Sequence, residues 1–227
     1  MRRCLMRIKI VGVGGIGCWL LRPLLRFLNF GEEKAFVTLI DGDTYEQKNL
    51  ERQDFPGGIG NKAEVQVEKF RSVFPGIELR AQSEYVKPES IEYLIEDGDI
   101  IFLCVDNHKT RSLFSEFCEE MEDIVLISGG NEYTDGNIQV HVREDDDDVT
   151  LPIANRFHPE IQEPEDRSPH EMSCEELAAD SASQLIFMNF AIASSMLNAF
   201  YAQSQGLLKY DEAYTDIVTN KTRSVKR

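Results

Sequence analysis

The sequence predicts an α/β fold: an open, mostly parallel sheet with helices on both faces and an antiparallel region at one edge. Short apolar runs of strand length alternate with longer amphipathic segments over residues 5–128, and this alternation is typical of parallel sheets. A glycine-rich turn joins the first apolar run to the first amphipathic segment. Because sheets that bind nucleotides begin in this way, the expected fold is Rossmann-like.

Each expected element rests on one of these patterns. Strands are expected at the apolar runs, which are residues 5–13, 35–40, 78–85, 99–105 and 123–128. Helices are expected between them, at residues 15–30, 62–74, 89–96 and 107–121. Gly31 ends the first helix, and Pro75 with Gly76 closes the second, because neither residue type continues a helix well.

The pattern changes after residue 130. Residues 136–142 alternate between apolar and polar side chains and are expected to pair antiparallel at a sheet edge. Residues 143–173 are acidic and contain prolines, so we expect a long, mobile surface loop. Residues 183–201 are apolar on almost all sides, which predicts a helix that is buried or covered by a second subunit. The tail, residues 210–227, contains a strand-like DIVT and a basic end.

These segments are expected to form one domain in three parts. Residues 1–130 form the nucleotide-binding core, residues 131–182 an edge strand with the acidic loop, and residues 183–227 the apolar helix with a C-terminal strand. A chain of 227 residues is long enough for one substantial hydrophobic core, and its length does not require a second.

The composition limits the classes of function. The formal net charge is −16, and an acidic surface repels nucleic-acid phosphates, so nucleic acid is not an expected partner. The five cysteines include no C-x-x-C pair, which argues against a disulfide framework and against a zinc site. The sequence has no recognisable signal peptide and no apolar run of membrane-spanning length. We therefore expect a cytoplasmic protein without a membrane partner.

The glycine loop GVGGIG indicates a phosphate site. Gly12 permits a tight turn, Gly14 lets the backbone approach phosphate oxygens, and Gly17 allows a helix and a strand to pack closely. The following helix offers unpaired N–H groups to an anion. Asp41 ends the second strand, where a carboxylate can accept hydrogen bonds from ribose hydroxyls. These residues fit NAD as well as ATP, and glycines that serve only a tight turn remain an alternative.

Residues 39–62 distinguish between the two nucleotides. Polar side chains gather there beyond what NAD requires, and they are Asp43, Asn49, Arg52, Gln53 and Lys62. Arg52 and Lys62 are cations with enough reach to neutralise a triphosphate. Asp106 follows a later buried strand, so Asp41 and Asp106 are expected to face one crevice. One acid for the ribose and one for Mg²⁺ indicate ATP with Mg²⁺ as the cofactors.

Five motifs occur in a characteristic order, and they are GVGGIG, DGD, NLERQ, GNK and VDN. In this order the chain resembles the ThiF/MoeB/HesA family, which is homologous to the adenylation domains of ubiquitin-activating enzymes. The resemblance is strong over residues 7–130 and weak from residue 174 to about 204. It implies a nucleotide site that consists of Gly12, Gly14, Gly15, Gly17, Asp41, Asp43, Asn49 and Gln53. It also implies that Asn49, Arg52 and Lys62 contact the phosphates and that Asp106 positions Mg²⁺.

The same resemblance implies a reaction. The C-terminal carboxylate of a ubiquitin-like or sulfur-carrier protein, usually ending in Gly-Gly, would attack the α-phosphorus of ATP and release pyrophosphate. Family habit also points to a homodimer. Three alternatives stay open: a relative that acts on another carboxylate or on a modified tRNA nucleoside, a non-catalytic scaffold subunit, and an NAD-binding oxidoreductase. The acidic surface disfavours tRNA, and the intact site cations disfavour a scaffold.

The chain also departs from the family pattern. Relatives carry an arginine on a helix ahead of the first strand, whereas this chain has only MRRCLM there, and Arg2 or Arg3 would have to substitute. The paired C-x-x-C motifs are missing, so no zinc site is expected. Cys174 matches a family cysteine that forms a thioester or persulfide, which makes it a candidate nucleophile. The adjacent Glu175 and Glu176 disfavour its thiolate, so an incidental thiol remains an alternative.

The other cysteines and the histidines carry weaker signals. Cys18 lies in the first expected helix and Cys104 in an expected strand, so both are expected in the core. The histidines at 108, 141, 158 and 170 have no metal-ligand spacing. His108 is near enough to Asp106 to touch a substrate, although a surface role is favoured.

Overall fold

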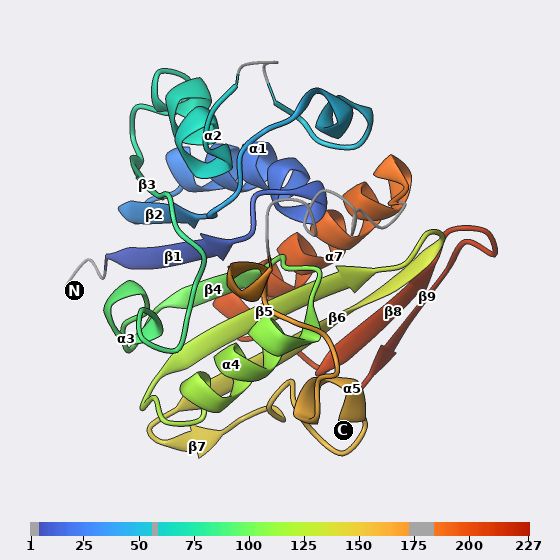
Figure 1. Cartoon of the computed structure of the whole chain (residues 1–227). Coiled ribbons are helices and arrows are strands. Elements are labelled where there is room, and N and C mark those ends of the chain that lie inside the picture. The colour runs from blue at the N-terminus through green and yellow to red at the C-terminus, as the bar shows by residue number, and fades with distance from the viewer. Residues whose placement is uncertain (1–4, 56–58, 173–183) are drawn as a thin grey trace.

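The computed structural model describes residues 5–55, 59–172 and 184–227 of the chain (Figure 1). Its elements in chain order are β1 (Met6–Val11), α1 (Gly15–Asn29), β2 (Ala35–Ile40), η1 (Gln47–Glu51), α2 (Lys62–Arg71), β3 (Glu78–Gln82), α3 (Ile91–Leu94), β4 (Ile100–Leu103), α4 (His108–Cys118), β5 (Ile124–Asn131), β6 (Asp135–Glu144), β7 (Asp147–Asp148), α5 (Pro159–Gln162), η2 (Pro169–Glu171), α7 (Ile186–Ser204), β8 (Glu212–Asp216) and β9 (Lys221–Val225). The expected alternation of strands and helices over the first part of the chain is therefore confirmed.

One sheet of nine strands organises the part of the chain that the structure describes. Its order is β3-β2-β1-β4-β5-β6-β8-β9, and β7 pairs with β6. The strands from β3 to β5 are parallel, while β6, β8 and β9 add to them in antiparallel fashion. The order reverses around β1, where β2 and β4 flank it on opposite sides. A sheet of this kind binds ligands at the carboxyl ends of the strands beside that reversal. The predicted α/β, Rossmann-like fold is confirmed.

Helices cover both faces of the sheet, as Figure 1 shows. One hydrophobic cluster joins α1, α2 and α7 to the sheet and includes Leu21 and Ile192, both fully buried. A second cluster joins α3 and α4 to the other face and includes Leu103 and Phe114. Successive residues of a strand point to opposite faces, so Phe102 packs in the first cluster and Leu103 in the second. This two-sided burial explains why β4 is a continuous apolar run and why β2 is interrupted only by Thr38.

The C-terminal part of the sheet differs from its prediction. The segment expected as an edge strand is β6, but β8 pairs with its far side, so β6 lies inside the sheet. The strand expected at DIVT is also wrong, because β8 ends at Asp216 and β9 begins only at Lys221. The Asp216 side chain accepts hydrogen bonds from the backbone N–H groups of Val218 and Thr219, 2.9 and 3.0 Å away. Such aspartate-led turns outweigh the β-propensity of the residues inside them.

Residues 143–172 belong to the packed fold, where the sequence predicted a mobile surface loop. Asp145 and Asp146 have positive φ angles of 53° and 68° and form a tight turn from β6 into β7. Further along the segment, Ile153 and Ile161 are buried. The burial of these two isoleucines was not predicted, because apolar residues are sparse in this acidic segment and give no clear periodicity.

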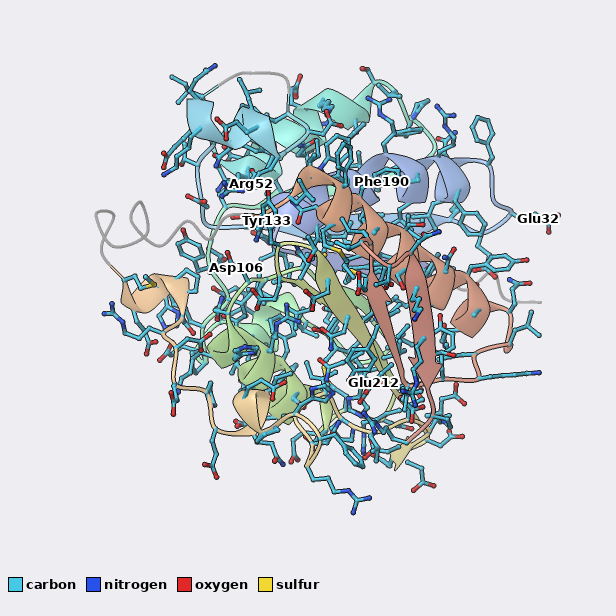
Figure 2. The ribbon with its side chains drawn as sticks, turned by 90° about the vertical axis from the view of Figure 1, so that its right-hand side faces the viewer. Glu32, Arg52, Asp106, Tyr133, Phe190 and Glu212 are labelled. Atoms are coloured by element: carbon cyan, nitrogen blue, oxygen red, sulfur yellow. The ribbon has the colours of Figure 1, made fainter. Side chains whose placement is uncertain are left out.

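The apolar helix is α7, and it is buried on one side only. Ile192 and Met196 are completely buried against the sheet, whereas Phe187 and Phe190 on the other side are 70% and 56% exposed. Phe190, labelled in Figure 2, meets the ring of Trp19 edge to face with centroids 6.0 Å apart. Within the part of the chain that the structure describes, no helix is long and apolar enough to cross a membrane.

Candidate functional site

The glycine loop lies between β1 and α1, and two of its glycines are required by backbone packing. Gly12 has a φ of 85°, and a Cβ atom there would come within 2.8 Å of the Cys104 carbonyl oxygen. A Cβ atom on Gly17 would come within 2.0 Å of the Gly12 carbonyl oxygen. These contacts let β1, β4 and α1 converge tightly. The first N–H groups of α1 consequently stand at the end of the sheet, where they form a binding position for an anion.

The remaining two glycines have different surroundings. A Cβ atom on Gly14 would meet only Gln53 at an ordinary 3.6 Å, so packing alone does not require glycine at this position. A Cβ atom on Gly15 would come within 2.3 Å of Gln184 and 2.7 Å of Asn189. Gly15 was predicted as a nucleotide contact, and the structure shows that it also admits the beginning of α7 against the loop. Asn189 is completely buried there, a contact that the sequence analysis missed.

Asp41 follows β2 and braces the glycine loop. One carboxylate oxygen accepts the Val13 N–H at 2.6 Å, and the other accepts the Asp43 N–H at 2.9 Å. Burial raises the pKa of the Asp41 carboxyl above its usual value, while the nearby Lys62 and the two N–H groups oppose that rise. The carboxylate thus connects the end of β2 to the loop after β1, and each oxygen retains capacity for a further hydrogen bond.

Lys62 and Asp43 form an ion pair at the start of α2. Lys62 is buried, and its ammonium lies 6.0 Å from the centre of the Tyr45 ring. Asn61 caps the same helix by accepting the N–H groups of Ala63 and Glu64. Asp43 and Lys62 belong to one predicted polar set, and the structure pairs them directly and positions the lysine at the start of a helix.

Arg52 and Gln53 lie just after η1 with unsatisfied polar atoms. Among the described residues, Arg52 Nε and Gln53 Oε1 are buried and have no hydrogen-bond partner. Buried polar groups are normally paired, so unpaired atoms on two consecutive residues that line the same cavity indicate a ligand position. Asn49 is buried as well, and its side-chain oxygen accepts the Glu46 N–H at 2.8 Å. That contact holds the η1 turn, so the observed part of Asn49 is structural.

Asp106 follows β4 and is exposed, and the start of α4 lies beside it. Asn107 caps this helix by accepting the Thr110 N–H at 2.8 Å. Asp166 accepts the N–H groups of His108 and Lys109 at 2.6 and 2.9 Å. The segment that was expected to be a mobile loop therefore anchors itself next to Asp106. Sequence reasoning missed Asp166, because nothing local marks a contact between positions so far apart.

One cavity of about 1070 Å³ collects these side chains at the carboxyl ends of β1, β2 and β4. Its volume suits a nucleotide together with part of a second substrate. Arg52 and Asp106, labelled in Figure 2, both line it. The predicted residues on its walls are Gly12, Gly14, Gly15, Asp41, Asp43, Asn49, Arg52, Gln53, Lys62 and Asp106. Gly17 does not line the cavity and acts through packing. Further lining residues that were not predicted as site residues include Gln139, His158, Glu160, Asp166 and Tyr214.

The site fits ATP and a phosphate-bound magnesium ion better than a metal centre built by protein alone. Across the described ranges, no three side chains of His, Cys, Asp or Glu are grouped closely enough to hold a metal ion. Mg²⁺ commonly takes one or two carboxylates and completes its shell with water and substrate phosphates. Asp106 would supply a carboxylate of that kind, and the unpaired Arg52 Nε suits phosphate oxygens.

The cysteines that the structure describes are core residues. Burial raises the pKa of both Cys18 and Cys104 to about 12, which keeps them protonated at neutral pH. Cys18 Sγ accepts the Asp54 N–H at 3.2 Å and so helps to position the segment beside Arg52. The expectation that Cys18 and Cys104 are core residues is confirmed. Cys174, Arg2 and Arg3 lie outside the described residues.

The glycine turn, the acid after β2 and the cations around one cavity define a nucleotide-binding α/β protein. Residues 4–208 match the ThiF family, and the chain belongs to that family. The resemblance based on the glycine loop and the NLERQ and VDN motifs is therefore confirmed.

Two curated relatives show how far the similarity extends. "Adenylyltransferase and sulfurtransferase uba4" of Pyricularia oryzae is 30% identical over 136 residues, which are 59% of this chain and 26% of that protein. "tRNA threonylcarbamoyladenosine dehydratase" of Haemophilus influenzae is 30% identical over 133 residues, which are 56% of this chain and 49% of that protein. This match spans at most about half the length of these relatives.

Solved structures share the fold over nearly the whole chain. PaaA superposes with a TM-score of 0.71 at 17% identity, covering 97% of this chain and 64% of that one. MccB of E. coli, solved with ATP, superposes with a TM-score of 0.73 at 15% identity, covering 97% and 63%. At such identities the likeness establishes the common fold.

Proposed function

We propose that this protein is an ATP-dependent adenylyltransferase that activates the C-terminal carboxylate of a ubiquitin-like or sulfur-carrier protein. The observation that carries the proposal is the single cavity in which the glycine loop, Asp41, Arg52, Lys62 and Asp106 meet. These residues come from separate segments of the chain, and only the sheet brings them together. Family membership supports the same activity, as does the similarity to uba4, which is named an adenylyltransferase and sulfurtransferase.

The proposed reaction joins a carboxylate oxygen of the carrier to the α-phosphorus of ATP. The bond between the α-phosphorus and the bridging oxygen to the β-phosphate breaks, and pyrophosphate leaves with its electron pair. Arg52 and Lys62 offset the negative charge that gathers on the phosphate oxygens in the transition state. Asp41 accepts ribose hydroxyls, and the N–H groups of α1 accommodate a phosphate. Mg²⁺, positioned by Asp106, supplies further charge neutralisation when it is bound.

Charge disfavours tRNA as the substrate. A molecule of formal net charge −16 is poorly suited to tRNA, although one relative is named as a tRNA dehydratase. NAD remains the alternative nucleotide, because the glycine loop and Asp41 serve it equally well. The Arg52 and Lys62 cations favour ATP, since a dinucleotide does not require both.

A homodimer and a covalent step complete the proposal. The exposed rings of Phe27, Phe187, Phe190 and Tyr201 lie along α1 and α7, and exposed apolar surface of this kind supports a subunit interface. Cys174 is the proposed acceptor of the activated carboxylate: its thiolate attacks the acyl carbon of the adenylate, AMP leaves, and a thioester forms. The proposed place of the reaction is the cytoplasm.

Exchange of labelled pyrophosphate into ATP tests the adenylation step. The substrate is a small β-grasp protein that ends in Gly-Gly, and its control is the same protein without those two residues. We expect exchange with the first and none with the second. Exchange in a Cys174→Ala variant together with loss of the covalent adduct would place that cysteine after adenylation. Tight NADH binding without ATP binding would contradict the proposal and favour an oxidoreductase.

A further inference from the structure

Arg111 is a buried arginine on α4 that the proposed reaction does not yet use. It is 6% exposed and lines the cavity wall near Asp106. Its Nη1 donates to the Ser128 hydroxyl at 2.5 Å, and its Nη2 donates to the carbonyls of Val105 and Gly129 at 2.5 and 2.7 Å. Val105 follows β4, and Ser128 and Gly129 lie within β5, where Ser128 pairs with the last residue of β4, Leu103. The guanidinium therefore joins two neighbouring strands at the edge where the cavity lies.

The guanidinium of Arg111 donates to a hydroxyl and two carbonyls, and none of these acceptors is a carboxylate that would neutralise its charge. Within the described part of the chain, no acidic side chain lies within ion-pair distance of it. Burial lowers the pKa of its guanidinium, and Asp106 is the carboxylate that most opposes this. A buried charge without a paired acid is costly, so an apolar side chain would fill the same space at lower cost. What a guanidinium alone offers here is a rigid fork of donors.

The sheet is shaped to admit this fork. A Cβ atom on Gly130 would come within 2.9 Å of Arg111 Nη2. Gly130 has no positive φ, so its backbone conformation does not require glycine. The space for the guanidinium is therefore the feature that an added side chain would remove.

Val105 connects Arg111 to the proposed magnesium ligand. Its carbonyl belongs to the peptide unit that leads directly into Asp106, and Arg111 holds that carbonyl. On the other side, the Cys104 N–H donates to the Val11 carbonyl at 2.8 Å and aligns the same stretch with β1. Asp106 itself is exposed, so its position depends on the backbone from which it projects.

We propose that Arg111 is a positioning residue, whose fork fixes the backbone at Val105 and thereby aims the Asp106 carboxylate at the metal-bound nucleotide. This inference rests on the proposed function and adds to it a residue outside the family motifs described above. The planar geometry of the guanidinium, and not its charge alone, holds the Val105 carbonyl in place. Lysine keeps the charge but cannot reach the hydroxyl and both carbonyls at once.

The test measures metal binding separately from catalysis. Mn²⁺ binding is followed by electron paramagnetic resonance with the full-length protein and a non-hydrolysable methylene analogue of ATP. We expect Arg111→Lys and Arg111→Gln to weaken Mn²⁺ binding by about tenfold to a hundredfold, as for other residues that orient metal ligands. Binding of the analogue without metal, measured in EDTA, should stay unchanged. In an Asp106→Asn background, the Arg111 variants should cause no further loss.

Two further variants keep the result interpretable. Gly130→Ala retains Arg111 but crowds its Nη2, so it should reproduce the weaker Mn²⁺ binding. Arg143→Gln is the matched control, because Arg143 also donates to a backbone carbonyl, that of Met121, but does not line the cavity. It should leave Mn²⁺ binding unchanged.

Wild-type Mn²⁺ affinity in Arg111→Lys and Gly130→Ala would overturn the inference and leave the adenylation proposal standing. Equal weakening in Arg143→Gln would also overturn it, because the effect would then be general destabilisation. Failure of the wild-type protein to bind the ATP analogue at all would instead overturn the proposed function itself.

Discussion

Trp19 donates its indole N–H to the backbone carbonyl of Arg52 at 3.0 Å. The bond links α1 to the cation that faces the cavity, and the Phe190 ring supports Trp19 from α7. The helix that begins at the glycine loop therefore also positions Arg52, one of the residues proposed to contact phosphate.

Replacing Trp19 with Phe tests this link. The ring contact with Phe190 is retained, but Arg52 loses the donor at its carbonyl, a hydrogen bond of about 1 kcal/mol. We expect kcat/KM in pyrophosphate exchange to fall by about fivefold. In an Arg52→Ala background the same replacement should have little effect. Equal losses in both backgrounds would show that Trp19 acts elsewhere.

Replacing Lys62 with Met removes a cation from the cavity. Because Lys62 is proposed to offset charge in the transition state, we expect the exchange rate to fall by about a hundredfold. Lys69→Met is the control on the same helix, since Lys69 pairs with Asp54 and does not line the cavity. A similar loss in both variants would contradict the assigned role.

Replacing Asp166 with Ala removes the acceptor of the first N–H groups of α4. We expect a decrease of about 1 kcal/mol in the free energy of unfolding, as for the loss of a helix cap. Hydrogen exchange at the His108 and Lys109 amides should become faster, because both donate to Asp166. Glu163→Ala is the control in the same segment. Unchanged exchange at both amides would show that Asp166 does not hold the segment in solution.

Glu212 is predicted to make stability dependent on pH at the acidic end. Burial opposes its ionisation, but hydrogen bonds from Arg227, Tyr214 and His158 hold the pKa of Glu212 below its usual value. A lowered carboxyl pKa stabilises the fold above the unfolded-state pKa, and this stabilisation is lost as pH falls through the folded-state pKa.

Glu212→Gln should therefore lower the free energy of unfolding by about 3 kcal/mol at pH 7, because a partner of a buried ionic network is removed. Urea unfolding at a series of pH values should show that the difference from wild type shrinks once pH falls below 4.5, the ordinary value for the residue. Glu33→Gln, in an exposed turn, is the control. A difference that stays constant with pH would contradict the assignment.

Local patterns were sufficient for the first part of the fold. The apolar runs of β1, β2 and β4 are buried on both faces, so their composition reveals them directly. The candidate site could also be predicted from the sequence, because Asp41 and Asp106 follow such strands and the carboxyl ends of parallel strands lie at one edge of the sheet.

Local patterns were not sufficient for the C-terminal part of the fold, where contacts between distant residues and side-chain hydrogen bonds decide the structure. β6 was expected at an edge of the sheet, but β8 pairs with its far side. The alternation of apolar and polar residues within β6 could not reveal that pairing. The DIVT stretch was expected to be a strand because of its composition. It is a turn instead, because the Asp216 side chain accepts backbone hydrogen bonds, which β-propensity does not take into account.

The sequence by itself determined the α/β class, the glycine loop and the polar residues that gather around a nucleotide, because short segments with regular patterns encode each of them. Only the tertiary structure decided that Trp19 holds Arg52, that Asp166 closes the start of α4 and that Arg111 joins β4 to β5. Each of those contacts joins separate segments of the chain, and no local sequence pattern indicates that they meet. The packed sheet brings them within hydrogen-bond distance, and that proximity is a property of the whole fold.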